Sequence, residues 1–153
     1  MYELWGGGAP FRHEPVSNEL KDRNSATVRL LGATAHIMHH LKTDPRFTDT
    51  KVAWVSCCDE PRWAAECLGK FTTSDGETPL AQCVHSSHIY KHNKQVHFQR
   101  LRAEFPHVEF EQMLFFDNEA GNIRNVSKIG VKCMYAPDGM TMEAWEQGLA
   151  LFK

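Results

Sequence analysis

Two short apolar runs constrain the fold of this chain more than any other feature of its sequence. They are VAWV at residues 52–55 and MLFF at residues 113–116, both rich in β-branched or aromatic side chains. Uninterrupted apolar runs of this length are typical of strands that are buried on both faces, as in a parallel sheet. We therefore predict an α/β fold with a mostly parallel sheet that is covered on both sides.

Helical patterns alternate with these runs. Apolar spacing, capping residues and helix-stopping Pro or Gly predict helices over residues 35–44, 59–69, 94–105, 119–130 and 142–152. Two further short strands are predicted over residues 83–85 and 131–135. Residues 1–27, with Gly6–Gly8 and two prolines, are predicted to be an irregular N-terminal loop segment. The length of 153 residues predicts a single domain over residues 1–153.

Composition argues against several classes of function. The net charge is −2, and no basic stretch suggests a nucleic-acid-binding face. The apolar runs are far shorter than the roughly 20 residues that span a membrane. The five cysteines include no Cys-x-x-Cys pair, which indicates free thiols in a reducing compartment. We therefore expect a cytoplasmic protein without nucleic-acid or membrane partners, and its oligomeric state is left open.

Polar residues follow both apolar runs. In a parallel sheet, Ser56 and Asp117 would lie at the carboxyl edge, where α/β proteins bind ligands. Each precedes a predicted helix, whose N-terminus attracts anions such as phosphate. A carboxylate there suits Mg²⁺, and Lys94 would neutralise phosphate charge. Taken singly, Ser56 and Asp117 are as well explained as helix caps, and Lys94 as a solvated surface residue.

The combination of these residues resembles a known family. The segment 111–138, EQMLFFDNEAGNIRNVSKIGVKCMYAPD, is similar to the metal-binding motif of magnesium-dependent phosphatases in the haloacid dehalogenase-like superfamily. Lys94, within HIYKHNKQVHFQRL, matches the family's lysine, and Ser56, at the end of VAWVS, matches its phosphate-binding Ser or Thr. The resemblance extends from about Val28 to the C-terminus.

The resemblance implies a Rossmann-like, three-layer αβα fold and a Mg²⁺ cofactor. It implies that a phosphomonoester is hydrolysed through an aspartyl-phosphate intermediate. The implied substrate is a small phosphorylated compound or phosphotyrosine. By the same resemblance Lys94 is the catalytic lysine that balances charge. Ser56 and Cys57 would bind phosphate, and Asp117 and Asn118 would hold Mg²⁺.

The chain departs from the family at its nucleophile. The family carries two aspartates, separated by one residue, at the end of a first strand that is central in the sheet. No such Asp-x-Asp pair occurs in these 153 residues. We expect an N-terminally truncated chain that is inactive alone, with an open slot in its core and marginal stability; the alternative is a catalytically inactive phosphate-binding module. Asn118 and Cys57 also replace the family's common Asp and Arg.

The histidines and Cys57 are weaker candidates for a functional site. His36 and His40 are four residues apart and would share a helix face that could chelate a transition metal, although exposed histidines without function explain them better. His85 and His88 lie near the Lys94 segment and are secondary candidates for the site. A cysteine-based phosphatase would need a phosphate loop with Arg about six positions after Cys57, and the sequence has no such loop.

Overall fold

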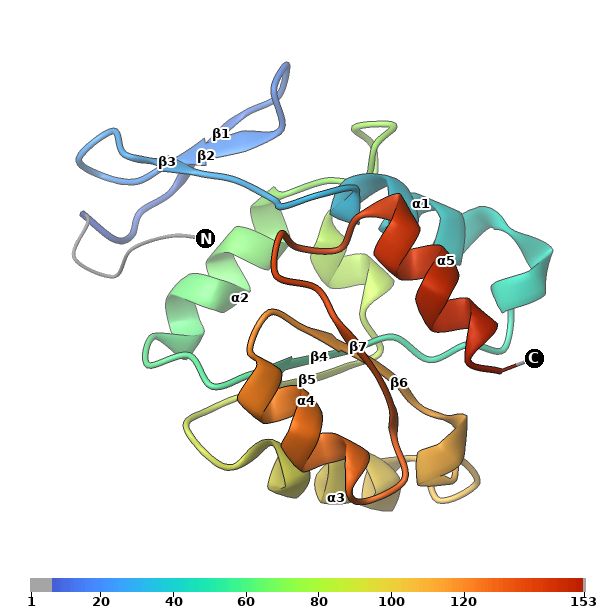
Figure 1. The fold of residues 1–153 in the computed structure, drawn as a ribbon. Coiled ribbons are helices and arrows are strands. Elements are labelled where there is room, and N and C mark those ends of the chain that lie inside the picture. Colours follow the sequence, from blue (N-terminus) through green and yellow to red (C-terminus); the bar gives the residue numbers. More distant parts are fainter. Residues whose placement is uncertain (1–6, 153) are drawn as a thin grey trace.

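The computed structural model describes residues 7–152 of the chain, in which strands and helices alternate from β4 onward (Figure 1). The strands are β1 (Arg12–Glu14), β2 (Glu19–Lys21), β3 (Thr27–Val28), β4 (Ala53–Ser56), β5 (Ser86–Ile89), β6 (Leu114–Asp117) and β7 (Lys132–Tyr135). The α-helices are α1 (Thr34–Thr43), α2 (Pro61–Lys70), α3 (Lys94–Glu104), α4 (Ala120–Ser127) and α5 (Met142–Ala150). Short 3-10 turns are η1 (Pro45–Phe47), η2 (Leu80–Cys83) and η3 (Phe110–Gln112). No helix within residues 7–152 is both long and apolar enough to span a bilayer.

The predicted α/β architecture with parallel strands is confirmed. β4 pairs in parallel with β5, with Val55 opposite His88, and β6 pairs in parallel with β7, with Phe115 opposite Cys133. Each pair forms its own two-stranded sheet, and β4 is not hydrogen-bonded to β6. Helices α1 and α5 lie above the strands and α3 and α4 below them in the view of Figure 1. The expected three layers are therefore present, but the parallel sheet is divided in the middle.

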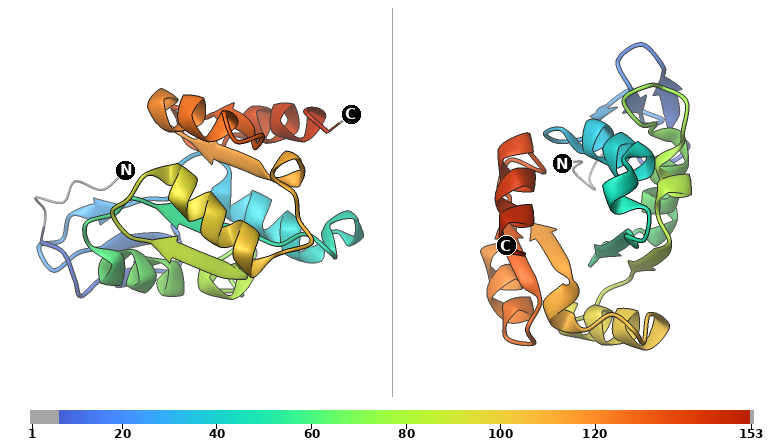
Figure 2. Two further views of the ribbon diagram at one scale, coloured as in Figure 1. Left: turned by 90° about the horizontal axis from the view of Figure 1, so that it is seen from below. Right: turned by 90° about the vertical axis from the view of Figure 1, so that its right-hand side faces the viewer.

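The buried apolar side chains are divided in the same way. One cluster packs β4 and the N-terminal strands against α1 and α2, and its members include Leu20, Met38, Leu68 and Leu80. The second packs α3 and α4 against β6, and its members include Phe98, Leu101, Phe115 and Val126. Figure 2 shows β4–β5 and β6–β7 on opposite sides of the molecule in its right-hand view. A cavity of about 1300 Å³, lined by all residues of β4 and of β6, lies between them; we call it the interstrand cavity.

The irregular structure predicted for residues 1–27 is wrong where the described part of that segment forms the strands β1, β2 and the start of β3. β1, β2 and β3 form an antiparallel sheet, which buries Leu20 and Val28 completely or nearly so. The preceding loop is tied to α2, because the Phe11 N–H donates to the Glu66 carboxylate at 2.8 Å. Strands of two or three residues are too short for an alternating pattern to be recognised in the sequence.

The glycine-rich start is a close-packed loop rather than an open one. Gly6 lies outside the described residues, whereas Gly7 and Gly8 are buried. Gly8 has a φ of +69°, and a Cβ on it would meet the Trp63 ring at 2.3 Å. Only glycine combines that backbone conformation with so close an approach.

The strand predicted over residues 83–85 is displaced. Leu80–Cys83 forms the 3-10 turn η2, and the strand begins at Ser86. β5 pairs with one strand only, so its Ser-Ser-His-Ile sequence lies at a sheet edge. The Ser86 hydroxyl donates to the Glu104 carboxylate of α3 at 2.6 Å. A polar edge strand lacks the apolar run by which buried strands are recognised.

We expect Gly148→Ala to destabilise the fold. A Cβ on Gly148 would lie 2.7 Å from Cζ of Phe116, so the ring must shift to keep α5 on β6. Such overpacking costs about 1–3 kcal/mol, measurable as a lower urea midpoint. The matched control is Gly121→Ala in α4, where a Cβ meets nothing within 4 Å. There, higher helix propensity should stabilise by up to about 1 kcal/mol. Equal effects of both changes would contradict the packing argument.

Candidate functional site

Lys94 connects the carboxyl ends of β4 and β6. It is the first residue of α3, and the Asn93 side chain caps that helix by accepting the Gln95 N–H. The Lys94 ammonium donates to the Val55 carbonyl at 2.9 Å and lies 3.7 Å from Oδ2 of Asp117. The Lys94 side chain is only 5% exposed. The structure therefore excludes the interpretation of Lys94 as a solvated surface residue.

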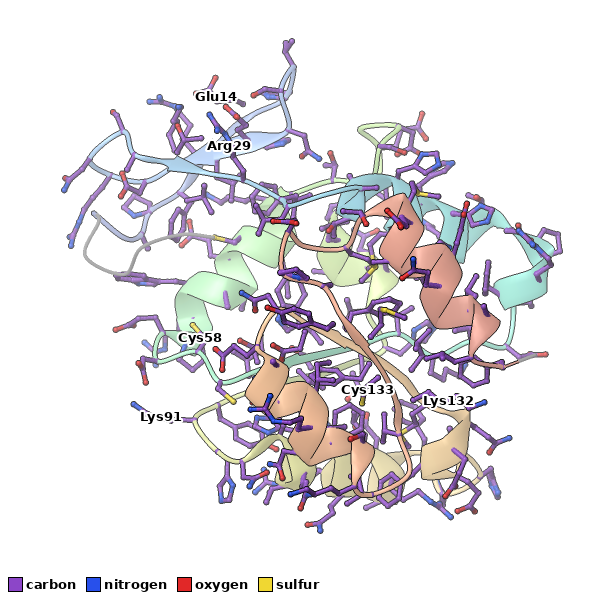
Figure 3. All side chains as sticks on the ribbon, in the orientation of Figure 1. Glu14, Arg29, Cys58, Lys91, Lys132 and Cys133 are labelled. Carbon is purple, nitrogen blue, oxygen red and sulfur yellow. The ribbon has the colours of Figure 1, made fainter. Side chains whose placement is uncertain are left out.

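Lys91, three residues earlier in the loop before α3, makes a useful contrast. It projects from the periphery of the molecule (Figure 3) and forms an ion pair with Asp59 at 3.0 Å. Its side chain is 80% exposed. Two lysines in one loop-and-helix segment thus have opposite environments, which the sequence does not distinguish.

Asp117 ends β6 and is held by the start of α4. Its Oδ1 accepts the Glu119 N–H at 2.7 Å, and its Oδ2 accepts from the Asn122 side-chain amide at 3.0 Å. The N-cap position of α4 is occupied by Glu119, so Asp117 precedes the cap. Its side chain is 10% exposed. These bonds orient the carboxylate toward Lys94 and leave acceptor capacity on both oxygens.

Asn122 was not identified as a site residue from the sequence. It lies in the first turn of α4, where its amide donates to Asp117 and, at 3.4 Å, to Glu119. The available signal was its position in the first turn of the helix that follows an acid at a strand end, where a side chain can reach back toward that acid.

Ser56 and Cys57 follow β4 at the same edge. The Ser56 carbonyl accepts the Tyr90 N–H at 3.0 Å, which completes the pairing with β5. α2 begins only at Pro61, with Glu60 at its N-cap, so the alternative role of Ser56 as the cap of that helix is wrong. The exposed Cys57 thiol donates to the His92 carbonyl at 3.1 Å. Ser56, Cys57 and Asn118 all line the interstrand cavity together with Lys94 and Asp117.

Three other histidines bind partners away from Lys94 and Asp117. His40 pairs with Asp44 at 3.2 Å and His88 with Glu104 at 3.1 Å, while His85 accepts the Val52 N–H. Within residues 7–152, no three His, Cys, Asp or Glu side chains gather as a metal cluster. Burial raises the pKa of Cys133 to about 11, so this thiol stays protonated near neutral pH.

His97 supports the loop that presents Lys94. It is fully buried, and its ring stacks on Tyr90 with centroids 4.2 Å apart. Its two ring nitrogens lie 3.1 Å from the Asn93 carbonyl and 3.0 Å from the Tyr90 carbonyl. Burial lowers the pKa of His97 below its ordinary 6.5, despite these two carbonyls. The His97 ring thus connects the two ends of the loop between β5 and α3, through the Tyr90 and Asn93 carbonyls.

We expect the contribution of His97 to stability to fall as the pH falls. Because the pKa is lower in the folded state, the unfolded chain takes up the proton first. The contribution is complete above pH 6.5 and is lost as the pH drops from 6.5 toward the folded-state pKa. The measurement compares unfolding free energies of the wild type and His97→Gln from pH 8 to pH 5, so that other titrations cancel. A difference that does not change with pH would contradict this assignment.

Comparison with known proteins identifies the family of this chain. The whole chain, residues 1–153, matches a family model described as Acid Phosphatase. A human protein named magnesium-dependent phosphatase 1 is 32% identical over 143 residues, which cover 94% of this chain and 74% of that protein. The resemblance to magnesium-dependent phosphatases that the motifs suggested is therefore confirmed.

Proposed function

The chain belongs to the acid phosphatase family, and from this premise we propose that its strand ends form the phosphate- and magnesium-binding part of a phosphomonoester phosphatase. The observation that carries the proposal is the position of Lys94. Its buried ammonium lies between the carboxyl ends of β4 and β6, beside Asp117. A buried cation at that edge, next to a carboxylate and a helix N-terminus, suits a phosphate group.

Asp117 and Asn118 fit a magnesium ion. Mg²⁺ is usually held by one or two carboxylates, with water and substrate phosphate completing its shell. Asp117 supplies an oriented carboxylate, and the exposed Asn118 supplies an amide oxygen. This small donor set agrees with the absence of a larger metal cluster in the described part of the chain. When bound, Mg²⁺ would neutralise phosphoryl oxygens; it is the cofactor named for the human relative.

The other residues would bind and orient the substrate. In this proposal the Ser56 hydroxyl donates to a phosphoryl oxygen, and Lys94 balances the charge of the phosphate. Cys57 offers only a weak S–H donor, now bound to the His92 carbonyl, so we expect weaker phosphate binding than an arginine would give. The substrate class is a small phosphorylated compound or phosphotyrosine. Five free thiols support a reducing, cytoplasmic location.

Hydrolysis needs a nucleophile that these strands do not provide. In the proposed reaction a carboxylate oxygen attacks phosphorus, the ester P–O bond breaks, and the leaving alcohol takes a proton from an acid. Water then hydrolyses the aspartyl-phosphate and releases inorganic phosphate. Among the four described parallel strands, β4 to β7, only β6 ends in a carboxylate, and Asp117 is already paired with Lys94. We therefore propose that these 153 residues alone bind phosphate without turnover.

The second candidate is a phosphate-binding module that has no catalytic role. The same observation favours it, because a cation, a hydroxyl and two helix N-termini are sufficient for binding. The two candidates differ in how they would respond to an added nucleophile. A phosphatase site is arranged for in-line attack and would then hydrolyse its substrate, whereas a binding module would not.

The test combines binding with turnover. Calorimetric titration of the 153-residue chain with inorganic phosphate is expected to show binding that strengthens with Mg²⁺, while p-nitrophenyl phosphate is not hydrolysed above background. Mg²⁺-dependent hydrolysis would show that another group acts as nucleophile. Absence of phosphate binding with and without Mg²⁺ would contradict both candidates.

A further inference from the structure

Helix α4 bonds to the candidate site through two asparagines that are three residues apart. The Asn122 side-chain amide donates to Oδ2 of Asp117 at 3.0 Å, and the Asn125 side-chain amide donates to Oδ1 of Asn93 at 2.8 Å. Side chains three residues apart are neighbours on a helix surface. One face of α4 therefore reaches Asp117 and also the start of α3, which covers the same side of the strands (Figure 1).

Asn125 bonds to the residues on both sides of Lys94. Its side-chain amide donates to Asn93, which is the N-cap of α3, and its backbone carbonyl accepts the Gln95 side-chain amide at 2.7 Å. Lys94, between these two residues, is the first residue of the helix. The two bonds therefore hold the beginning of α3, and with it the Lys94 backbone, against α4.

The position of the Lys94 backbone affects where its ammonium lies. The ammonium is attached through a flexible four-carbon stem, yet it bonds to the Val55 carbonyl at 2.9 Å and lies 3.7 Å from Asp117. A functional group works well only if its supporting residues hold it to within roughly 0.5 Å. Asn122 supports the carboxylate in this pair, and Asn125 supports the backbone that carries the cation.

The other bonds at the start of α3 do not replace the bond from Asn125. The Asn93 side chain also accepts the Gln95 N–H at 2.8 Å, and a His97 ring nitrogen lies 3.1 Å from the Asn93 carbonyl. Both contacts join residues of α3 and its preceding loop to each other. They shape the first turn of the helix, whereas the bonds of Asn125 fix that turn relative to α4 and hence to Asp117.

We propose that Asn125 is a positioning residue, which acts through Asn93 to hold the Lys94 ammonium at its distance from Asp117. The part of this inference that concerns phosphate rests on the proposed function. Asn125 does not line the interstrand cavity, so it acts on a ligand only through Lys94. A phosphate that contacts both the lysine and a metal ion at Asp117 depends on their separation, whereas the metal ion alone does not.

The experiment compares Asn125→Ala with the wild-type 153-residue chain. The variant loses the amide donor but keeps the carbonyl that accepts from Gln95. Calorimetric titration with inorganic phosphate in the presence of Mg²⁺ should show about fivefold weaker binding, the equivalent of one hydrogen bond. Mg²⁺ affinity without phosphate should equal that of the wild type. The control is Ser127→Ala, because the Ser127 hydroxyl donates within α4, to the Arg124 carbonyl at 3.2 Å, and phosphate affinity should not change.

A spectroscopic measurement follows Lys94 directly. In the ¹⁵N-labelled chain, a buried and hydrogen-bonded ammonium should exchange its hydrogens slowly and give a lysine side-chain signal, assigned by its absence from Lys94→Met. Asn125→Ala should broaden or remove this signal, and Ser127→Ala should leave it unchanged. Asn93→Ser keeps a hydroxyl that can cap α3 but is too short to reach Asn125. It should reproduce both effects of Asn125→Ala, and it decides the matter if Asn125→Ala does not fold.

Three results would overturn the proposal. The first is wild-type phosphate affinity in Asn125→Ala, and the second is an unchanged Lys94 signal in that variant. The third is a parallel loss of phosphate affinity, Mg²⁺ affinity and urea midpoint, which would indicate a general structural role. The Lys94 signal requires neither phosphate nor Mg²⁺. If the wild type does not bind phosphate, the proposed function is therefore refuted, and the signal alone decides the role of Asn125.

Discussion

Replacing Lys94 with methionine is expected to lower both the stability of the chain and its affinity for phosphate. Methionine keeps the apolar stem but removes the ammonium that bonds to the Val55 carbonyl and faces Asp117. Removing one partner of a buried ion pair costs about 3 kcal/mol. Loss of a charge-assisted bond to phosphate weakens binding by about 100-fold. Urea unfolding and calorimetric phosphate titration measure the two effects.

Lys91→Met is the matched control for this change. Lys91 makes one solvent-exposed ion pair with Asp59, at 3.0 Å. Exposed pairs contribute about 0–1 kcal/mol, so this variant should resemble the wild type in both measurements. If the two variants behave alike, the buried position of Lys94 does not have the role assigned to it.

Replacing Asp117 with alanine is expected to abolish specific magnesium binding. The variant loses the only carboxylate at the carboxyl ends of the four described parallel strands, β4 to β7, which the Glu119 N–H and the Asn122 amide hold in place. Loss of a charged ligand from so small a donor set should weaken Mg²⁺ at least about 100-fold, since loss of supporting residues alone costs 10–100-fold in metal sites. Calorimetry with Mg²⁺, or electron paramagnetic resonance with Mn²⁺ as a probe, measures the effect.

Glu146→Ala provides the comparison for Asp117→Ala. Glu146 is an exposed acid on α5, and removing it changes the net charge by the same amount. Metal affinity should remain as in the wild type. A similar loss in both variants would indicate nonspecific attraction of the cation to the chain and would contradict a site at Asp117.

A double-mutant cycle connects these two predictions. Lys94 and Asp117 are neighbours at 3.7 Å, so their effects on stability should not add. Pairs in contact usually couple by about 0.5–3 kcal/mol. Additive effects of Lys94→Met and Asp117→Ala on unfolding would mean that the two side chains do not interact in solution.

Some features follow from the sequence by itself, because local chemistry decides them. The apolar runs before Ser56 and Asp117 predicted β4 and β6 within one residue, since buried strands need continuous apolar side chains. Pro45 and Pro61 marked the end of α1 and the beginning of α2 correctly, because proline lacks the donor that a helix interior requires. Ser56, Asp117 and Lys94 were likewise identified as candidate site residues from the sequence and its family resemblance.

Other features were decided only by the tertiary structure, because they depend on residues far apart in the chain. The environment of Lys94 is set by Val55 and Asp117, on two strands that the local sequence does not relate to it. The sheet β1–β3 and the polar edge strand β5 are stabilised by pairing and by contacts with α2 and α3 rather than by their own patterns. The interstrand cavity has the same origin, since only the spatial arrangement of β4 and β6 shows which backbone edges remain unpaired.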